Sequence, residues 1–229
     1  MEALHKQAER EAIAQARTLE PQRHPSDGLL SDLRFRALVG EAAWARLPEP
    51  VRRRFSKCLA PGEMLLYRGT VVATELSLAG RILAILARAI GSPLPLTDGA
   101  IGPALVAVVE DERLGGQSWT RLYASPGRFP QVIHSAKRFR GPTGLEEYVG
   151  CGIGMALGVF VEGGALVFRS SHYFLEIGRL RWRLPRALAP GNMQITHREE
   201  GGGAFSFRLE LRHPLLGRLM HQLAYFCDP

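Results

Sequence analysis

The chain has 229 residues, of which 46% are hydrophobic and 22% charged, so it holds enough apolar material for one sizeable core, and a wholly disordered protein is excluded. Its formal net charge of +7 favours an anionic partner, which can be nucleic acid, an acidic membrane surface or a carboxylate ligand. The net charge does not distinguish these three classes.

Cysteine content and the first residues bear on the compartment. The three cysteines, Cys58, Cys151 and Cys227, form no Cys-x-x-Cys pair, and their odd number is typical of reduced thiols in a bacterial-type cytosol. Charged side chains in residues 1–20 leave no apolar core for a signal peptide. The longest apolar runs are too short, or interrupted by arginine, and cannot span a bilayer as a helix. We therefore expect a cytoplasmic protein.

The first part of the chain predicts helices. Residues 1–19 are typical of a solvated helix and residues 21–28 of a linker, so we expect 1–28 to be an appendage of a single β-rich domain over 29–229. Residues 35–55 predict a helical pair, broken at Pro48 and Pro50, that plugs or caps the sheet. A strand is expected over 65–75. A helix follows over 78–90 and ends at Gly91.

Short β-type segments separated by Gly- and Pro-rich turns fill the rest of the chain. The segments are 104–111, 118–124, 131–139, 145–162, 165–177, 180–184, 194–199 and 204–213, and 219–226 is a closing strand or a last helical turn. Strands joined by tight turns pair with their neighbours, and a long meander tends to close. We predict a mainly β (α+β) fold: an antiparallel meander forming a strongly curved sheet or closed barrel, with helix 78–90 crossing one opening and the N-terminal helices packed outside.

One strand carries a candidate anion-binding group. Trp119, Arg121 and Tyr123 alternate with other residues and so share one face. If that face is the interior, Arg121 must meet a carboxylate, because an unpaired buried charge is costly. The carboxylate belongs either to Glu146 or Glu147 or to a ligand. The alternative is an outward arginine stacked on aromatic rings.

Other strands carry polar residues that could converge on Arg121. Sharing a face are Ser135 and Lys137 on one strand, and Arg169, Ser171 and Tyr173 on another, while Arg208 alternates with Phe207 and Leu209. In a closed meander these would form an anchor for a carboxylate headgroup at the end of an apolar cavity. The alternative is a sheet with one solvated face, which shows the same alternation.

The glycine run in 150–158 leaves one face of its predicted strand almost without side chains, which indicates sharp curvature. No Gly-x-Gly-x-x-Gly register fits it, so nucleotide binding there is rejected. The seven histidines show no metal-ligand spacing, and no nucleophile motif is present. We expect no metal and no cofactor, and we find no catalytic motif.

Basic segments admit two further partners. Arg179, Arg181 and Arg183 share one face and could contact phosphates, although the aromatic residues are not interleaved as base-stacking platforms, so nucleic acid is not favoured. Arg81 and Arg88 flank the amphipathic helix 78–90 and permit contact with a membrane surface. A solvated basic face is the alternative for both.

Five short motifs carry a resemblance to a bacterial family. In order, they are Tyr67-Arg68-Gly69, Pro93-Leu94-Pro95, Trp119-Thr120-Arg121, Leu145-Glu146-Glu147 and His213-Pro214-Leu215-Leu216-Gly217-Arg218. Over roughly 39–228 the chain resembles the domain of unknown function 4166 family. Some members look to be fused to a dehydrogenase-like or membrane partner, which implies an accessory role. The resemblance supplies no catalytic residues.

These observations favour a binding module that holds a small apolar ligand with an anionic end. A fatty acid or an isoprenoid would fit that description. The residues expected to bind it are Trp119, Arg121, Tyr123, Ser135, Glu147, Tyr173 and Arg208. The first alternative is an accessory or catalytic domain that acts with an oxidoreductase on a lipid-like substrate, with Glu147 as base. The second is a scaffold that binds a protein partner through its basic face.

Overall fold

The computed structural model describes residues 7, 11, 14, 30, 31, 33–91, 93–111, 113–124, 127 and 129–229. Apart from residues 7, 11 and 14, the expected N-terminal helix and linker over 1–28 lie outside the described residues, as do Ser125 and Pro126 of one predicted turn. No helix among the described residues is long and apolar enough to cross a bilayer.

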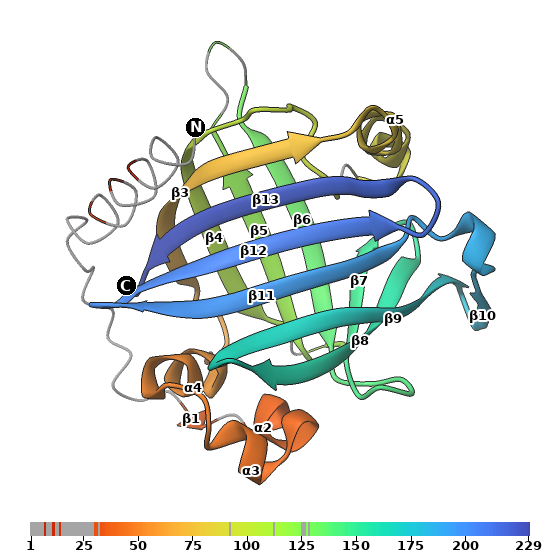
Figure 1. Ribbon diagram of the computed structural model, residues 1–229. Coiled ribbons are helices and arrows are strands. Elements are labelled where there is room, and N and C mark those ends of the chain that lie inside the picture. The colour runs from red at the N-terminus through yellow and green to blue at the C-terminus, as the bar shows by residue number, and fades with distance from the viewer. Residues whose placement is uncertain are drawn as a thin grey trace.

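Within the described part of the chain, ten antiparallel strands close into a β-barrel (Figure 1). The ring contains β3 (Leu65–Leu76), β4 (Gly102–Glu110), β5 (Gln117–Tyr123), β6 (Gln131–Arg138), β7 (Glu146–Gly150), β8 (Ile153–Glu162), β9 (Ala165–Ile177), β11 (Asn192–Gly201), β12 (Ala204–His213) and β13 (Gly217–Cys227). Pairing of β13 with β3 and of β8 with β9 leaves no open edge in the ring. The predicted antiparallel barrel is confirmed.

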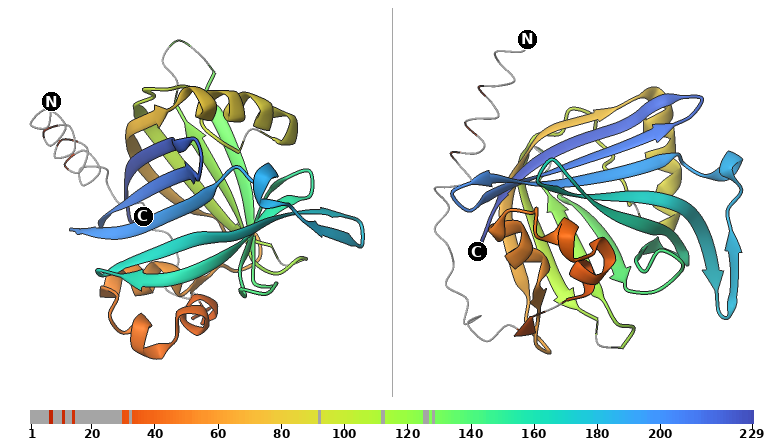
Figure 2. Two further views of the ribbon diagram at one scale, coloured as in Figure 1. Left: turned by 45° about the vertical axis from the view of Figure 1, so that its right-hand side comes forward. Right: turned by 60° about the horizontal axis from the view of Figure 1, so that its bottom comes forward.

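The remaining strands lie outside the ring. β10 (Leu180–Arg183) pairs with the second half of β9, whose first half pairs with β11. β1 (Leu30–Ser31) and β2 (Lys57–Cys58) form a separate two-stranded sheet. β9 therefore leaves the barrel wall along its length and carries β10 away as a projecting hairpin (Figure 2).

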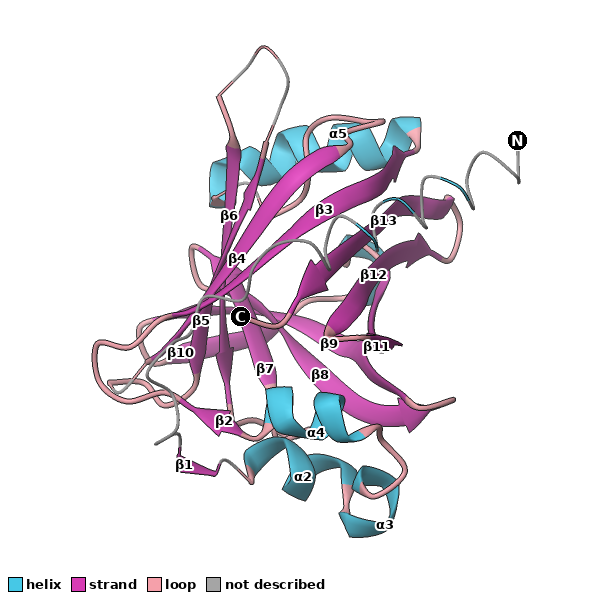
Figure 3. Ribbon diagram, turned by 90° about the vertical axis from the view of Figure 1, so that its left-hand side faces the viewer, coloured by secondary structure: helices cyan, strands magenta, loops and turns pink. Residues whose placement is uncertain are grey.

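Three short helices close one end of the barrel: α2 (Arg34–Val39), α3 (Glu41–Trp44) and α4 (Glu49–Phe55). Pro48 and Pro50 separate α4 from α3, because proline is tolerated only at the start of a helix. Phe35, Val51 and Phe55 are buried, and the rings of Phe35 and Phe55 pack on Phe168 of β9. The helices lie outside the ring of strands, as predicted, and plug its end (Figure 3).

The helix predicted after the first strand is present as α5 (Leu78–Leu86), which continues into the 3-10 turn η1 (Ala87–Ile90). The Ser77 hydroxyl accepts a hydrogen bond from the Gly80 amide at the start of the helix. Gly91 ends it in the left-handed conformation, with φ +105°. α5 lies at the end of the barrel opposite α2, α3 and α4 (Figure 3).

Two details of the predicted strands change. The single strand expected over 145–162 is wrong: it is two strands, β7 and β8, joined by a tight turn in which Gly150, Cys151 and Gly152 all have positive φ. The curvature expected from the glycine run is therefore partly a reversal of chain direction. The segment 219–226, left open between strand and helix, lies within β13.

Candidate functional site

The barrel encloses a cavity of about 360 Å³ that is lined mainly by apolar side chains. Phe55 of α4 and Phe168 of β9 border it on the side of the N-terminal helices. At the other end it is bordered by α5 and by the 3-10 turn η2 (Arg186–Leu188) before β11. Leu86 and Leu188 line the cavity although they are 67% and 72% exposed, so the cavity reaches solvent there. We call this end the mouth.

Arg121 points into the cavity from β5 on the face that it shares with Trp119 and Tyr123, and the alternation along the strand predicts this shared face. One guanidinium nitrogen donates to the hydroxyl of Ser135 at 3.1 Å, and the other lies 3.4 Å from Oε1 of Glu147. Glu147 belongs to β7 and is 3% exposed. Arg121, whose side chain is 19% exposed, thus finds its carboxylate partner within the chain itself.

A second cation, Lys137, meets the same carboxylate. Its Nζ lies 3.2 Å from Oε1 of Glu147 and 4.5 Å from the centre of the Trp119 ring. Its side chain is 4% exposed. Lys137 is not among the residues that the sequence predicts to bind a ligand. The signal for it is the face that it shares with Ser135 on β6, because an inward Ser135 requires an inward Lys137.

The buried charges do not cancel. In formal charges, Arg121 and Lys137 count as two positive groups and Glu147 as one negative group, so the cavity wall carries one excess positive formal charge. Burial opposes ionisation of Glu147, but attraction by Lys137 and Arg121 outweighs it and lowers its pKa to about 2. Burial lowers the pKa of Lys137, and Glu147 offsets part of that effect. The arrangement therefore holds Glu147 as an anion between two cations.

Two buried polar atoms beside these charges have no hydrogen-bond partner among the described residues: Nε1 of Trp119 and Oε2 of Glu147. A buried polar group without a partner is costly, and such groups in native proteins are commonly satisfied by water or a ligand. Trp119 could donate to an acceptor in the cavity, and Glu147 could accept from a donor. The polar wall thus has unused hydrogen-bonding capacity on both sides.

Tyr173 also lines the cavity, but Arg169 and Ser171, which were expected to share its face, do not. A β-bulge at Ser171 shifts the register, because Ala156 pairs with His172 whereas Leu157 pairs with Ser170. Tyr173 therefore points inward, while Arg169 points outward and pairs with Glu162 at 2.6 Å. The expectation that Arg169, Ser171 and Tyr173 share a face is wrong. Burial raises the pKa of Tyr173 to about 12, so its hydroxyl stays protonated.

Arg208 does not join the other predicted binding residues. On β12 the inward positions are Phe207, Leu209 and Leu211, which line the cavity, and Arg208 lies exposed on the outer face. Of the seven residues expected to bind a ligand, the structure brings six together around the cavity: Trp119, Arg121, Tyr123, Ser135, Glu147 and Tyr173.

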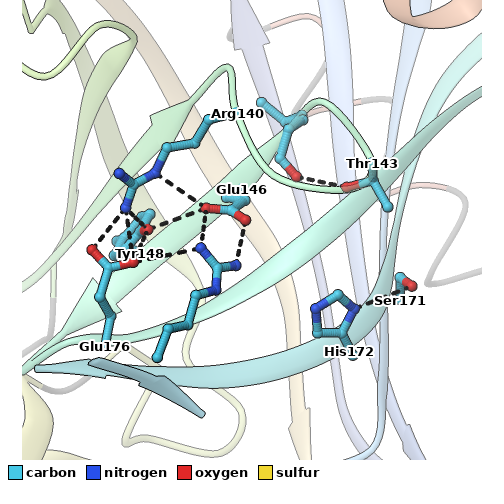
Figure 4. Close-up of polar contacts among 9 residues, drawn as sticks. Arg140, Thr143, Glu146, Tyr148, Ser171, His172 and Glu176 are labelled. Carbon is cyan, nitrogen blue, oxygen red and sulfur yellow. Dashed lines mark hydrogen bonds and ion pairs between the residues drawn. The ribbon is translucent and has the colours of Figure 1, made fainter. Parts of the chain in front are cut away.

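A separate ionic cluster lies on the outer face of β7 (Figure 4). Glu146 is fully buried there and pairs with Arg181 of β10 and with Arg140, whose Nε lies 3.3 Å from Oε2. The Tyr148 hydroxyl donates to Glu176 at 2.9 Å. Since these groups satisfy one another, the cluster fastens β10 to the barrel. It also occupies Arg181, the central arginine of the expected phosphate-binding ridge.

Comparison with known proteins identifies one family. The sequence profile described as Domain of unknown function (DUF4166) matches residues 47–226, which is most of the chain. The match contains every cavity residue named above. No curated protein and no solved structure matches the chain significantly.

Proposed function

Since the chain belongs to the DUF4166 family, whose description assigns no activity, we propose from the geometry that the barrel is a binding module for a small apolar molecule with an anionic end. Fatty acids and isoprenoid acids have this chemistry. The apolar part would lie against Phe168, Phe207 and the other apolar lining residues, and the anionic end would meet Arg121 and Lys137. The volume of about 360 Å³ is in the range of small-molecule sites, roughly 300–1,000 Å³.

One observation carries this proposal: the excess positive charge on the wall of an otherwise apolar cavity. An unmatched buried charge destabilises the folded protein unless something compensates it. A ligand carboxylate beside Arg121 and Lys137 would neutralise the wall. A lysine ammonium has three donors, so the contact with Glu147 leaves Lys137 able to bind such a group.

The catalytic alternative, with Glu147 as base, is less well supported. A general base works best when its pKa is near the working pH. Attraction by Lys137 and Arg121 overcomes burial and lowers the pKa of Glu147 to about 2, which makes it a poor proton acceptor at neutral pH. The same contacts suit a group that fixes two cations in place for an anion.

The test is ligand binding by the purified full chain. Native mass spectrometry before and after incubation with fatty acids and isoprenoid acids should show a 1:1 complex. An Arg121→Gln variant should bind the same acids at least about tenfold more weakly, the loss expected when a single charged contact of about 1.4 kcal/mol is removed. The matched control is Arg208→Gln, which removes the same charge from the outer face of β12 and should leave affinity unchanged.

Uncharged analogues complete the design. If the cationic wall selects the ligand, the methyl ester of a bound acid should bind more weakly than the acid itself, and this difference should shrink in Arg121→Gln. Equal affinity for acid and ester, or equal loss in the Arg121 and Arg208 variants, would contradict the proposal. So would a protein that binds none of the acids.

A further inference from the structure

α5 turns its large apolar side chains outward. Leu78 is 76% exposed, Ile82 52%, Ile85 60% and Leu86 67%. At helical spacing these four residues form one continuous stripe on the solvent side. A surface helix of a globular protein normally shows the opposite arrangement, with its apolar face toward the core.

The inner face of α5 carries small residues together with one leucine, Leu83, which packs against the core and lines the cavity. Gly80, Ala84 and Ala87 are buried there. Gly80 lies so close to the start of β13 that a Cβ would overlap the carbonyl oxygen of Leu219, which is why the helix can lie directly on the strand end. Because α5 packs on the barrel through the small residues and Leu83, the exposed stripe makes no comparable contribution to the fold.

Two other segments at the mouth expose leucine as well. Leu188 of η2 is 72% exposed, and Leu215 and Leu216, in the turn between β12 and β13, are 88% and 59% exposed. Strand directions place this turn, η2 and α5 at the same end of the barrel, and all three come forward together in the left view of Figure 2. We call these exposed leucines and isoleucines the mouth face.

The charge around the mouth face is predominantly positive. Five arginines are exposed in and beside these segments: Arg81, Arg88, Arg186, Arg212 and Arg218. Three carboxylates accompany them, Asp98 beside Arg81, Glu75 beside Arg218, and Glu210 at 3.2 Å from Arg212. Within the described part of the chain, Arg88 and Arg186 have no acidic partner. The surface thus combines exposed apolar side chains with an excess of arginine.

We propose that the mouth face docks on an anionic lipid bilayer. Exposed apolar patches of this kind mark interaction sites, and the combination of large apolar side chains with flanking arginine suits the interface of an anionic membrane. Burial of the Leu78–Leu86 stripe among the lipids would remove it from water, while Arg88 and Arg186 would reach the phosphates. A second copy of the chain fits less well, because a symmetric contact would bring arginines against arginines.

Docking in this orientation would place the opening of the cavity at the membrane surface. Leu86 belongs both to the cavity lining and to the exposed stripe, so the apolar interior of the barrel is continuous with the apolar docking surface. An amphipathic molecule could then pass between bilayer and barrel with little exposure to water. The docking itself does not depend on which ligand the cavity holds, so the two proposals can fail separately.

The experiment is flotation of the full chain, without added ligand, with two kinds of vesicle: phosphatidylcholine alone and a mixture of phosphatidylcholine and phosphatidylglycerol. The protein should float with the mixed vesicles and much less with the neutral ones, and added salt should weaken binding. The double variant Leu78→Glu/Ile85→Glu should reduce binding to mixed vesicles by at least about tenfold, since two apolar contacts are lost.

The matched control is Leu114→Glu. Leu114 is 51% exposed in the turn between β4 and β5, at the end of β4 away from α5, and its replacement should leave flotation unchanged. Thermal unfolding of each variant verifies that all are folded. Absence of flotation, equal binding to neutral vesicles, or equal loss in both variants would overturn the proposal. Concentration-dependent self-association abolished by Leu78→Glu/Ile85→Glu, without vesicle binding, would assign the face to a second copy instead.

Discussion

The guanidinium of Arg121 lies 3.4 Å from Oε1 of Glu147, inside a barrel where β6 separates the strands that carry them. The same oxygen is 3.2 Å from Nζ of Lys137 on that intervening strand. Three neighbouring strands thus direct one charged group each to a single point on an apolar wall, and β6 adds the hydroxyl of Ser135. This point is where pH, ligand and stability should be coupled.

We predict that acid removes the stabilisation contributed by Glu147. Its pKa is lowered to about 2 in the folded protein, against about 4.3 in an unfolded chain. Its contribution is therefore complete above about pH 4.5 and is lost as the pH falls toward 2, with a slope of up to about 1.4 kcal/mol per pH unit. Urea unfolding of the wild type and of Lys137→Met/Glu147→Gln at about pH 6 and about pH 3 measures the difference.

The double variant removes Glu147 together with Lys137, so this point keeps Arg121 as its one charged group and has no carboxylate to titrate. Its free energy of unfolding should therefore fall less between the two pH values than that of the wild type. Other carboxyls with lowered pKa, such as Glu176, contribute to both proteins alike. Identical pH dependence in the two proteins would show that Glu147 is not held ionised as described.

His197 should also make the stability of the protein depend on pH, in a higher pH range than Glu147. It is 1% exposed, its ring lies about 5 Å from those of Phe55, Phe205 and Phe207, and neither ring nitrogen has a hydrogen-bond partner among the described residues. Burial, together with repulsion by Arg54, lowers its pKa well below the usual value. The folded protein therefore keeps His197 neutral where the unfolded chain, with a pKa near 6.5, binds a proton.

It follows that the free energy of unfolding should decrease as the pH falls below about 6.5, by up to about 1.4 kcal/mol per pH unit from this residue. A His197→Phe variant should lose that part of the dependence, since phenylalanine fits among the three rings without a titrating group. Denaturant unfolding at about pH 7 and about pH 5.5 gives the comparison. A variant as sensitive to acid as the wild type would rule out the role given to His197.

Gly80→Ala should destabilise the protein, by about 1–3 kcal/mol. In an exposed helix the same change would stabilise by up to about 1 kcal/mol, so the sign of the effect is diagnostic. The new methyl group would overlap the carbonyl oxygen of Leu219 and push α5 away from β13. Thermal unfolding measures the change, and a higher midpoint in Gly80→Ala would mean that α5 does not rest on β13 as described.

Substitution of two arginines of β10 by alanine should change the free energy of unfolding by very different amounts. Arg181 pairs with the fully buried Glu146, and its guanidinium lies 3.7 Å from the centre of the Phe174 ring. Arg183 is exposed, without an acidic partner in the part of the chain described. Arg181→Ala should cost about 1–3 kcal/mol, because the buried Glu146 loses one of its two cationic partners and keeps Arg140 and the Tyr148 hydroxyl, whereas Arg183→Ala should stay within about 0.5 kcal/mol. Equal free energies of unfolding for the two variants would contradict the fastening role of Arg181.

Much of the barrel could be predicted because its signals are local. Gly- and Pro-rich turns separate most of the strands, and Ser77 and Gly91 limit the helix between β3 and β4. The sequence does not determine whether Arg121 points inward, since alternation defines which residues share a face but not which face lies inside. The structure decides it, because Trp119 and Tyr123 line the cavity with it.

The incorrect strand predictions arise where a single residue interrupts the inward–outward alternation of side chains along a strand. The turn at Cys151 looks in the sequence like one more step of a glycine-alternating strand, because the positive φ of a cysteine leaves no compositional signal. The bulge at Ser171 likewise has no recognisable signal in the sequence, and it moves Tyr173 to the inner face. Arg208 differs for another reason: it alternates with Phe207 and Leu209, and the structure turns these two apolar residues, not Arg208, toward the cavity.

The pairing of β13 with β3 has a consequence for how the barrel forms. The Gln222 amide and the Thr74 hydroxyl in this pair are hydrogen-bonded across 148 residues of chain, whereas most other neighbours in the ring are joined by short turns. Bringing such distant segments together carries a large loop-closure entropy. During synthesis, the strands can therefore assemble into an open, curved sheet, but closure must wait for β13. The cavity is therefore enclosed only when β13 pairs with β3, and before that step the growing chain exposes an apolar inner surface to its surroundings.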